Sequence, residues 1–274
     1  MTAADLIALP RPPADHRVAY GADALQFGEL RLPEGPGPHP VAIVIHGGCW
    51  LAEYDLAYMS ALAAALAEDG IATWSIEYRR VGDAGGGWPG TFADVAAAAD
   101  HLRELAEEYH LDLERVVALG HSAGGHLALW LAGRHRLGGE DALCGAAPLP
   151  LVGVVALAGI PDLATYASPA GCGSAVAPLL GGEPSEVPDR LRRASPIELA
   201  PLGVPQVLIV GELDTIVPSE QAERYAAVAG PAGDQVVVRE IPEAGHFELV
   251  VPEGEAWSTV RDAVRELLST PTPL

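Results

Sequence analysis

Ser122 is the residue whose surroundings most clearly suggest covalent chemistry. It lies in the pentapeptide Gly-His-Ser-Ala-Gly over 120–124, between an apolar run that predicts a strand over 115–119 and an Ala- and Leu-rich run that predicts a helix over 123–134. A sharp strand-to-helix turn pushes its central residue toward unfavourable φ and ψ angles and needs glycine beside it, and it lifts the serine oxygen clear of the sheet. The motif and its place predict that Ser122 is a nucleophile. The alternative is a glycine-rich turn whose serine only caps the helix.

Two later residues have the types and the order that a serine nucleophile needs. A histidine must accept the serine proton, and a carboxylate must orient that histidine. Asp214 directly follows a predicted strand and His246 follows the next strand and a turn, so the chain order is Ser, Asp, His. The sequence therefore predicts that Asp214 is the orienting acid and His246 the base. The alternatives are an Asx turn or a helix cap for Asp214 and a surface-loop histidine for His246.

Other carboxylates compete with Asp214 for the role of the acid. Glu212 lies two residues earlier and is the first reserve, and Asp162 and Glu243 are further candidates. Asp214 is preferred because residues 216–218 start a helix and leave Asp214 on the connecting loop.

Acyl transfer also needs N–H donors for the oxyanion that develops on the substrate, and the loop after the predicted strand 41–45 can supply them. There the glycines that follow His46 let backbone N–H groups turn toward a ligand. We predict an oxyanion hole made by the N–H groups of Gly48, Cys49 and Ala123. His46 is expected to tie the loop by hydrogen bonds, and the Cys49 thiol to fill space.

Two histidines and two tryptophans lie where binding residues could be. His121 and His126 flank Ser122, but no carboxylate or cysteine at metal-ligand spacing accompanies them. They are expected to pack within the fold, and neither a metal nor a cofactor is expected. Trp50 and Trp88 follow predicted strands, where pockets form in α/β proteins, and are the candidates for substrate contact.

The elements that must position these residues alternate between strands and helices. Apolar runs rich in β-branched residues predict strands that are buried on both faces, and strands that alternate with long helices imply a parallel sheet. We therefore expect an α/β fold with a mostly parallel central sheet and helices on both faces. Predicted strands cover 41–45, 71–78, 115–119, 152–158, 207–210 and 235–241, and predicted helices cover 55–69, 92–109, 123–134, 219–229 and 256–268.

One long segment interrupts this alternation. Residues 162–205 are broken by Pro and Gly and are too long for an ordinary connection, so we interpret them as a lid-like insertion. The chain has 274 residues, and single α/β domains commonly reach about 200–250, so residues 1–274 are expected to form one domain.

Charge and composition exclude several classes of function. Lys and Arg total 16 and Asp and Glu total 37, and the resulting net charge of −21 repels nucleic acids and anionic membranes. The start of the chain lacks the pattern of a signal peptide, so a cytoplasmic protein is expected, and the acidity would also suit an exported protein or one from a salty milieu. Cys49, Cys144 and Cys172 are an odd number at unrelated spacings, and no disulfide is expected.

These motifs together resemble the α/β-hydrolase esterases close to kynurenine formamidase and the feruloyl and acetyl xylan esterase branch, and more distantly the hormone-sensitive-lipase group. The resemblance implies the α/β-hydrolase fold from about Gly28 onward. It also places Ser122, Asp214 and His246 as the catalytic triad and Gly48, Cys49 and Ala123 as oxyanion donors. It rests on HGGCW at 46–50, EYRR at 77–80, GHSAGGHLALWLAGR at 120–134, GELDTIVP at 211–218 and AGH at 244–246.

The chain departs from the lipase-like group in two ways. Cys49 replaces the third glycine of the HGGG motif, and little chain precedes His46 to build an N-terminal helical cap. Any cover over the site is therefore expected from residues 162–205, and the pocket is expected to be open.

The resulting hypothesis is a cofactor-independent hydrolase of carboxylic esters that works through an acyl-enzyme intermediate. Residues 162–205 offer few consecutive apolar residues, so small acyl groups or compact aromatic substrates are expected. Arylformamidase activity on a formamide is the alternative, and a peptidase or a non-catalytic binding protein are weaker ones. The expected partner is a small-molecule ester or formamide.

Overall fold

The computed structural model describes residues 1–167 and 171–269, and one sheet lies at its centre. Within these residues the sheet has eight strands in the order β1-β2-β4-β3-β5-β6-β7-β8. β1 and β2 pair antiparallel to their neighbours, and β3 to β8 pair in parallel, which confirms the mostly parallel sheet. The strands are β1 His16–Ala19, β2 Phe27–Arg31, β3 His39–Ile45, β4 Ala72–Ile76, β5 Leu111–His121, β6 Gly153–Leu157, β7 Gln206–Gly211 and β8 Val236–Ile241.

The central strands are buried on both faces, which explains their continuous apolar sequence. All residues from Val41 to Ile45 of β3 are buried, as are all residues of β4, β6 and β7. Because β3, β5, β6, β7 and β8 run in parallel, their carboxyl ends lie at one edge of the sheet. The loops that carry the predicted site residues all leave from that edge.

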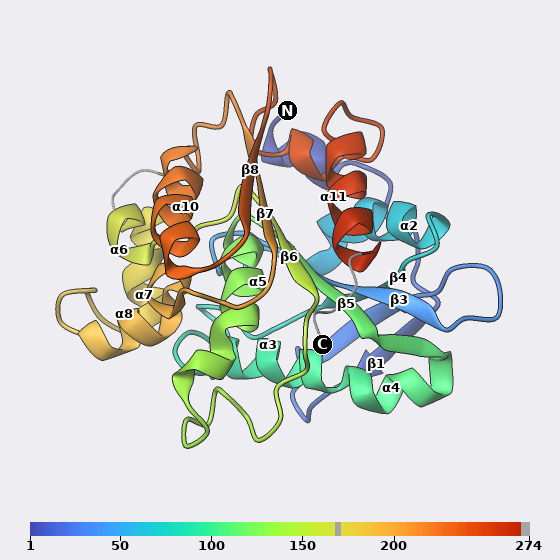
Figure 1. Cartoon of the computed structure of the whole chain (residues 1–274), viewed down its shortest axis with the longest axis horizontal. Coiled ribbons are helices and arrows are strands. Elements are labelled where there is room, and N and C mark those ends of the chain that lie inside the picture. Colours follow the sequence, from blue (N-terminus) through green and yellow to red (C-terminus); the bar gives the residue numbers. More distant parts are fainter. Residues whose placement is uncertain (168–170, 270–274) are drawn as a thin grey trace.

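Helices pack against both faces of the sheet (Figure 1). α2 and α11 lie on one side, and α3, α5 and α10 lie on the other. None of the helices in the described ranges is both long and apolar enough to cross a membrane. The main helices are α2 Ser60–Glu68, α3 Gly90–Asp100, α4 Leu102–Tyr109, α5 Ala123–Gly133, α10 Glu220–Ala232 and α11 Trp257–Ser269, and 3-10 turns occur at η1 Leu56–Met59, η2 Arg134–Leu137 and η4 Glu248–Val250.

Two helical details differ from the prediction. The predicted helix 92–109 divides at His101, where the N–H of Glu104 bonds the carbonyl three residues back and tightens the turn. A further helix, α1 (Ala3–Ile7), was not predicted. Its N-terminus is capped by Thr2, whose side chain accepts the N–H of Asp5 while the Asp5 carboxylate accepts the N–H of Thr2.

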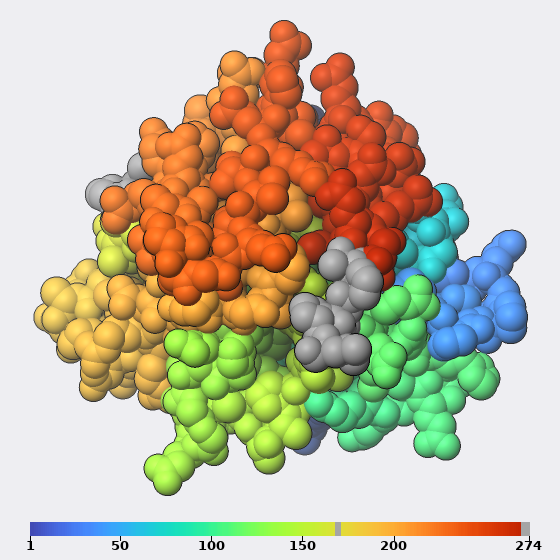
Figure 2. All heavy atoms as spheres, in the orientation of Figure 1, coloured from blue at the N-terminus to red at the C-terminus, as the bar shows by residue number. Residues whose placement is uncertain are grey.

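The described residues of the segment 162–205, which are 162–167 and 171–205, form short helices and connecting loops on one flank of the molecule. Figure 1 shows them beside α10, and in the space-filling view of Figure 2 this yellow-to-orange flank lies directly against it. Pro188 and Pro196 each start a helix, because proline suits the first helical turn and ends what precedes it. Its elements are α6 Leu163–Tyr166, η3 Gly173–Ala175, α7 Val176–Leu180, α8 Pro188–Ala194 and α9 Pro196–Leu199.

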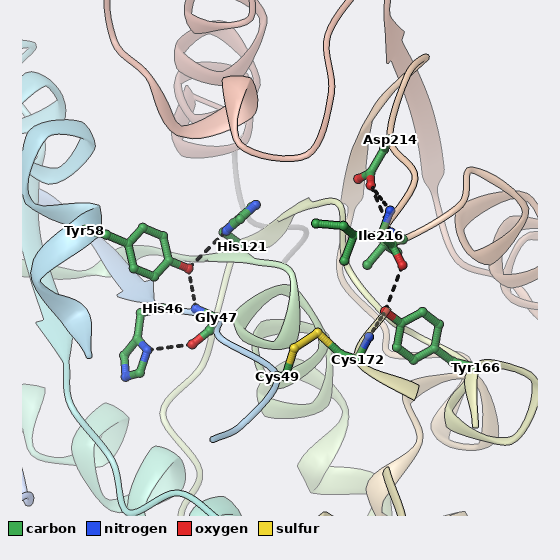
Figure 3. Close-up of a disulfide and its surroundings, with 10 residues drawn as sticks. His46, Gly47, Cys49, Tyr58, His121, Tyr166, Cys172, Asp214 and Ile216 are labelled. Carbon is green, nitrogen blue, oxygen red and sulfur yellow. Dashed lines mark hydrogen bonds between the residues drawn. A yellow bond between two sulfur atoms is a disulfide. The ribbon is translucent and has the colours of Figure 1, made fainter. Parts of the chain in front are cut away.

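The expectation of no disulfide is wrong. Cys49, in the loop after β3, is bonded to Cys172, just before η3, with 5.1 Å between their Cα atoms (Figure 3). The two cysteines are separated by 123 positions, so spacing along the chain held no sign of the pair. They meet because the segment 162–205 folds back toward the carboxyl ends of the strands. Cys144 is buried and free.

Candidate active site

Ser122 occupies a strained turn between β5 and α5. Its φ is 56° and its ψ is −121°, a combination that non-glycine residues rarely adopt. Neighbouring glycines make the turn possible, because a Cβ on Gly120 would lie 2.1 Å from the carbonyl oxygen of Gly124, and a Cβ on Gly124 would lie 2.1 Å from that of Ile45. The N–H of Ser122 donates to Leu157 at 2.8 Å and fixes the turn to β6.

Asp214 and His246 form a close, buried pair beyond the ends of β7 and β8. His246 Nδ1 lies 2.7 Å from Asp214 Oδ2. The other carboxylate oxygen accepts the N–H groups of Ile216 at 2.8 Å and Val217 at 2.9 Å, so Asp214 forms an Asx-type turn and holds the histidine at the same time. With its proton on Nδ1 facing the carboxylate, the imidazole presents Nε2 as a proton acceptor.

The reserve carboxylates have other partners. Glu212 is exposed and accepts the backbone N–H of Glu243 at 2.9 Å. Asp162 caps α6 through the N–H of Thr165 at 3.2 Å and pairs with Arg224 at 3.2 Å. The structure therefore brings Asp214, and not these residues, to His246.

Ser122 and His246 line one cavity of about 280 Å³. The loops after β3, β5, β7 and β8 all contribute to its wall, and so do α1 and Cys172. Its surface is mostly apolar. The lining residues are Ala3, Leu6, Ile7, Gly48, Cys49, Tyr54, Tyr58, His121, Ser122, Cys172, Ile216, His246 and Phe247.

The contribution of α1 corrects the expectation that all cover comes from residues 162–205. Three residues of α1 line the cavity, whereas Cys172 is the lining residue from the described part of 162–205. Thr2 and Asp5 have the spacing of a helix-capping pair, followed by apolar residues, and this signal could have revealed α1 in the sequence.

The loop after β3 has positive φ values at three consecutive residues. Gly48, Cys49 and Trp50 have φ values of 96°, 54° and 58°, so three consecutive residues are left-handed. The N–H groups of Gly48 and Cys49 have no hydrogen-bond acceptor within residues 1–167 and 171–269, and both residues line the cavity. Ala123, the third predicted donor, is the first residue of α5.

His46 anchors this loop, as the sequence predicted. Its Nδ1 lies 2.9 Å from the carbonyl oxygen of Gly47, and its Nε2 lies 2.8 Å from the carboxylate of Glu77. Burial would raise the pKa of Glu77, but the charge and hydrogen bond of His46, together with the charge of Arg80, lower it below its usual value. Glu77 thus acts as a buried anion that holds the loop to the end of β4.

The structure does not bring the two predicted substrate-contacting tryptophans to the cavity. Trp50 is fully buried, and its indole N–H donates to Nδ1 of His126 at 3.1 Å, so the prediction for Trp50 is wrong. Its positive φ turns the side chain inward. Trp88 is half-buried and packs on Phe92. The guanidinium carbon of Arg193 lies over the Trp88 ring, 4.9 Å from the ring centroid.

His121 and His126 each bond to the backbone, as expected for packed histidines. His126 Nε2 donates to the carbonyl of Ala194 at 2.8 Å, and His121 Nε2 lies 3.0 Å from the carbonyl oxygen of His246. In the portion of the chain that the structure describes, no group of three potential metal ligands occurs.

The buried histidines predict that acid weakens the fold before carboxylates are titrated. Burial lowers the pKa of His126 to about 4, whereas an unfolded histidine titrates near 6.5. Between these values the unfolded chain binds a proton that the folded chain excludes. Stability is therefore complete above about pH 6.5 and falls toward pH 4 by about 1.4 kcal/mol per pH unit for this residue. Urea unfolding from pH 7.5 to 4.5 measures the slope.

The variant His126→Gln should show a smaller slope than the wild type. His16→Gln, which changes an exposed histidine, is the matched control and should keep the wild-type slope. Equal slopes for His126→Gln and the wild type would contradict the prediction.

Comparison with known sequences shows relatives among esterases. Esterase LipC of Mycobacterium tuberculosis (strain ATCC 25618 / H37Rv) is 30% identical over 251 residues, which are 85% of this chain and 60% of that protein. The probable isoprenylcysteine alpha-carbonyl methylesterase ICMEL1 of Arabidopsis thaliana is 30% identical over 112 residues, which are 40% of this chain and 23% of that protein. The chain thus spans 60% or less of the length of these two relatives.

Solved structures establish the fold as that of the α/β-hydrolases. A truncated form of a carbohydrate esterase from gut microbiota superposes with a TM-score of 0.82 at 25% identity, covering 94% of this chain and 99% of that one. Esterase B from Lactobacillus rhamnosis (HN001) gives 0.81 at 21% identity, covering 96% and 89%. The family model of BD-FAE matches residues 30–228, which include the Ser122 turn and Asp214. Since this match spans well over half of the chain, the protein belongs to the BD-FAE family.

Proposed function

We propose that the chain is a serine carboxylesterase in which Ser122 is the nucleophile, His246 the base and Asp214 the orienting acid. The observation that carries the proposal is the buried Asp214–His246 pair at 2.7 Å, whose histidine lines the same cavity as Ser122. The N–H groups of Gly48, Cys49 and Ala123 are the proposed oxyanion donors. Family membership and the esterases named above support this assignment.

In this mechanism the Ser122 hydroxyl oxygen attacks the ester carbonyl carbon as His246 Nε2 takes the hydroxyl proton. The carbonyl oxygen becomes an oxyanion that the three N–H groups stabilise. The histidine then gives its proton to the leaving alcohol, and an acyl-enzyme remains on Ser122. Water, deprotonated by the same histidine, releases the acid and regenerates the serine.

Two further expectations from the sequence concern arylformamidase activity and a cytoplasmic location. The relatives and structures named above are esterases, so they do not support arylformamidase activity, the alternative from the sequence. A cytoplasmic location stays a prediction, and the Cys49–Cys172 disulfide weighs against it because disulfides are rare in reducing compartments.

The size of the cavity supports a preference for short acyl chains. Its volume of about 280 Å³ lies at the lower end for small-molecule sites. We expect kcat/KM for p-nitrophenyl esters to be highest at acetate or butyrate. It should fall steeply at octanoate and palmitate, since methylenes outside the cavity lack the roughly 0.8 kcal/mol each that burial contributes. Initial rates across the four esters measure this.

Ile7→Ala sharpens the test, because Ile7 of α1 lines the cavity. Shortening it should raise the relative kcat/KM for longer acyl chains. Val228→Ala on α10 removes a similarly exposed apolar side chain outside the cavity and should leave the chain-length profile unchanged. An optimum at octanoate or beyond in the wild type would contradict the short-acyl preference.

A further inference from the structure

Tyr58 and His121 join the three loops of the proposed active site by a single chain of hydrogen bonds. Tyr58 lies in η1, and its hydroxyl oxygen is 2.5 Å from the N–H nitrogen of Gly47 and 3.0 Å from Nδ1 of His121. On the other side of the ring, His121 Nε2 is 3.0 Å from the carbonyl oxygen of His246. Figure 3 shows the Tyr58 hydroxyl between Gly47 and the His121 ring.

The direction of every bond in this chain follows from its chemistry. The carbonyl oxygen of His246 can only accept, so His121 carries its proton on Nε2. The Nδ1 atom of a neutral ring is then an acceptor, so the Tyr58 hydroxyl must donate to it. The hydroxyl oxygen in turn accepts the N–H of Gly47. Burial, and next the charge of His246, lower the pKa of His121 well below its usual value, which agrees with a neutral ring.

Each end of this chain of hydrogen bonds lies next to a group of the proposed mechanism. Gly47 precedes Gly48 and Cys49, whose N–H groups are proposed oxyanion donors. His121 precedes Ser122, and the carbonyl that it binds belongs to His246. His121 is 1% exposed, so water does not readily replace its two hydrogen bonds, and Tyr58 lines the cavity.

We propose that Tyr58 and His121 are positioning residues that set the oxyanion loop, the serine turn and the histidine loop relative to one another. This inference rests on the proposed triad and oxyanion hole. The Tyr58 hydroxyl donates its proton to His121, so it is not a donor to the substrate. Its effect on the reaction comes from holding the loop that contains Gly47.

Tyr58→Phe tests the proposal, with Tyr225→Phe as its matched control. Tyr225 of α10 is fully buried, whereas Tyr58 is half-buried, and the Tyr225 hydroxyl donates to Gln206 at 2.6 Å, outside the cavity. Both variants lose one hydrogen-bonded tyrosine hydroxyl, and thermal unfolding shows whether their stabilities fall comparably. Only Tyr58→Phe should lower kcat, by about 10- to 100-fold, because misplacing reacting groups by about 1 Å costs about that much. KM for p-nitrophenyl butyrate should change less than about threefold.

A transition-state analogue separates positioning from general loosening. A trifluoromethyl ketone bonds covalently to the serine oxygen and places its own oxyanion in the hole, so its affinity reports on the oxyanion donors. Its inhibition constant should rise in Tyr58→Phe by about the factor lost in kcat, and should not change in Tyr225→Phe. His121 is tested by a second pair of variants. His121→Gln retains a hydrogen-bond donor and an acceptor, so its kcat should be at least about tenfold higher than that of His121→Leu.

Several results would overturn the inference. A kcat of Tyr58→Phe equal to that of Tyr225→Phe would do so, as would a change confined to KM, or equal losses in His121→Gln and His121→Leu. The proposed function is checked separately, by mapping a fluorophosphonate label on wild-type Ser122. Wild-type labelling together with an unaffected Tyr58→Phe would refute the positioning role alone, whereas a wild type that is neither labelled nor active would refute the proposed function.

Discussion

Replacing Ser122 by Ala should lower kcat for p-nitrophenyl acetate by about four orders of magnitude or more. The side chain lies on the strained turn between β5 and α5 and shares a cavity with His246. Without its hydroxyl no acyl-enzyme forms, and the remaining donors can only polarise a bound ester. Steady-state hydrolysis at neutral pH measures the loss, and the variant should also fail to react with a fluorophosphonate.

Ser195→Ala is the matched control for this substitution. Ser195 is also buried, and its hydroxyl donates to the carbonyl of Pro161 and accepts the N–H of Leu163, away from the cavity. Its loss should lower stability and leave kcat within about threefold. If Ser122→Ala kept more than about a tenth of the wild-type activity, the assignment of the nucleophile would be wrong.

Opening the Cys49–Cys172 disulfide should lower the free energy of unfolding by about 2–5 kcal/mol. The bond links residues 123 positions apart, and a cross-link over so long a loop removes much of the freedom of the unfolded chain. It also ties the loop after β3, which carries the proposed oxyanion donors, to the chain near Tyr166. The Tyr166 hydroxyl accepts the N–H of Cys172 at 3.0 Å and donates to the carbonyl of Ile216 at 2.9 Å. Activity is therefore expected to fall together with stability.

Urea unfolding with and without a dithiol reductant measures the effect, and the free cysteine supplies the control. Cys144→Ser should respond to the reductant as the wild type does, whereas the double variant Cys49→Ser/Cys172→Ser should start from the lower stability and not respond. Alkylation verifies that the reductant has opened the disulfide completely. If the unfolding free energy of the wild type is then the same with and without reductant, the cross-link does not stabilise the fold.

The sequence was sufficient to predict the mostly parallel sheet and the proximity of Asp214 to His246 and of His246 to Ser122. Buried parallel strands demand continuous apolar runs, and these marked β3 to β7 to within a few residues. The Ser122 turn could be predicted because its glycines answer a local steric need. Asp214 and His246 followed from chain order, since loops that leave the same edge of a parallel sheet lie close together.

The walls of the cavity depended on contacts between distant parts of the chain. Trp50 follows a strand, as pocket residues often do, but the positive φ values of its loop turn its side chain into the core. Cys49 meets Cys172, and α1 reaches the cavity, because segments far apart in sequence fold back over one edge of the sheet. Periodicity and turn chemistry act over a few residues and therefore specify strands, helices and sharp turns. Which of these segments then touch is set by the packing of the whole chain, and no local pattern records it.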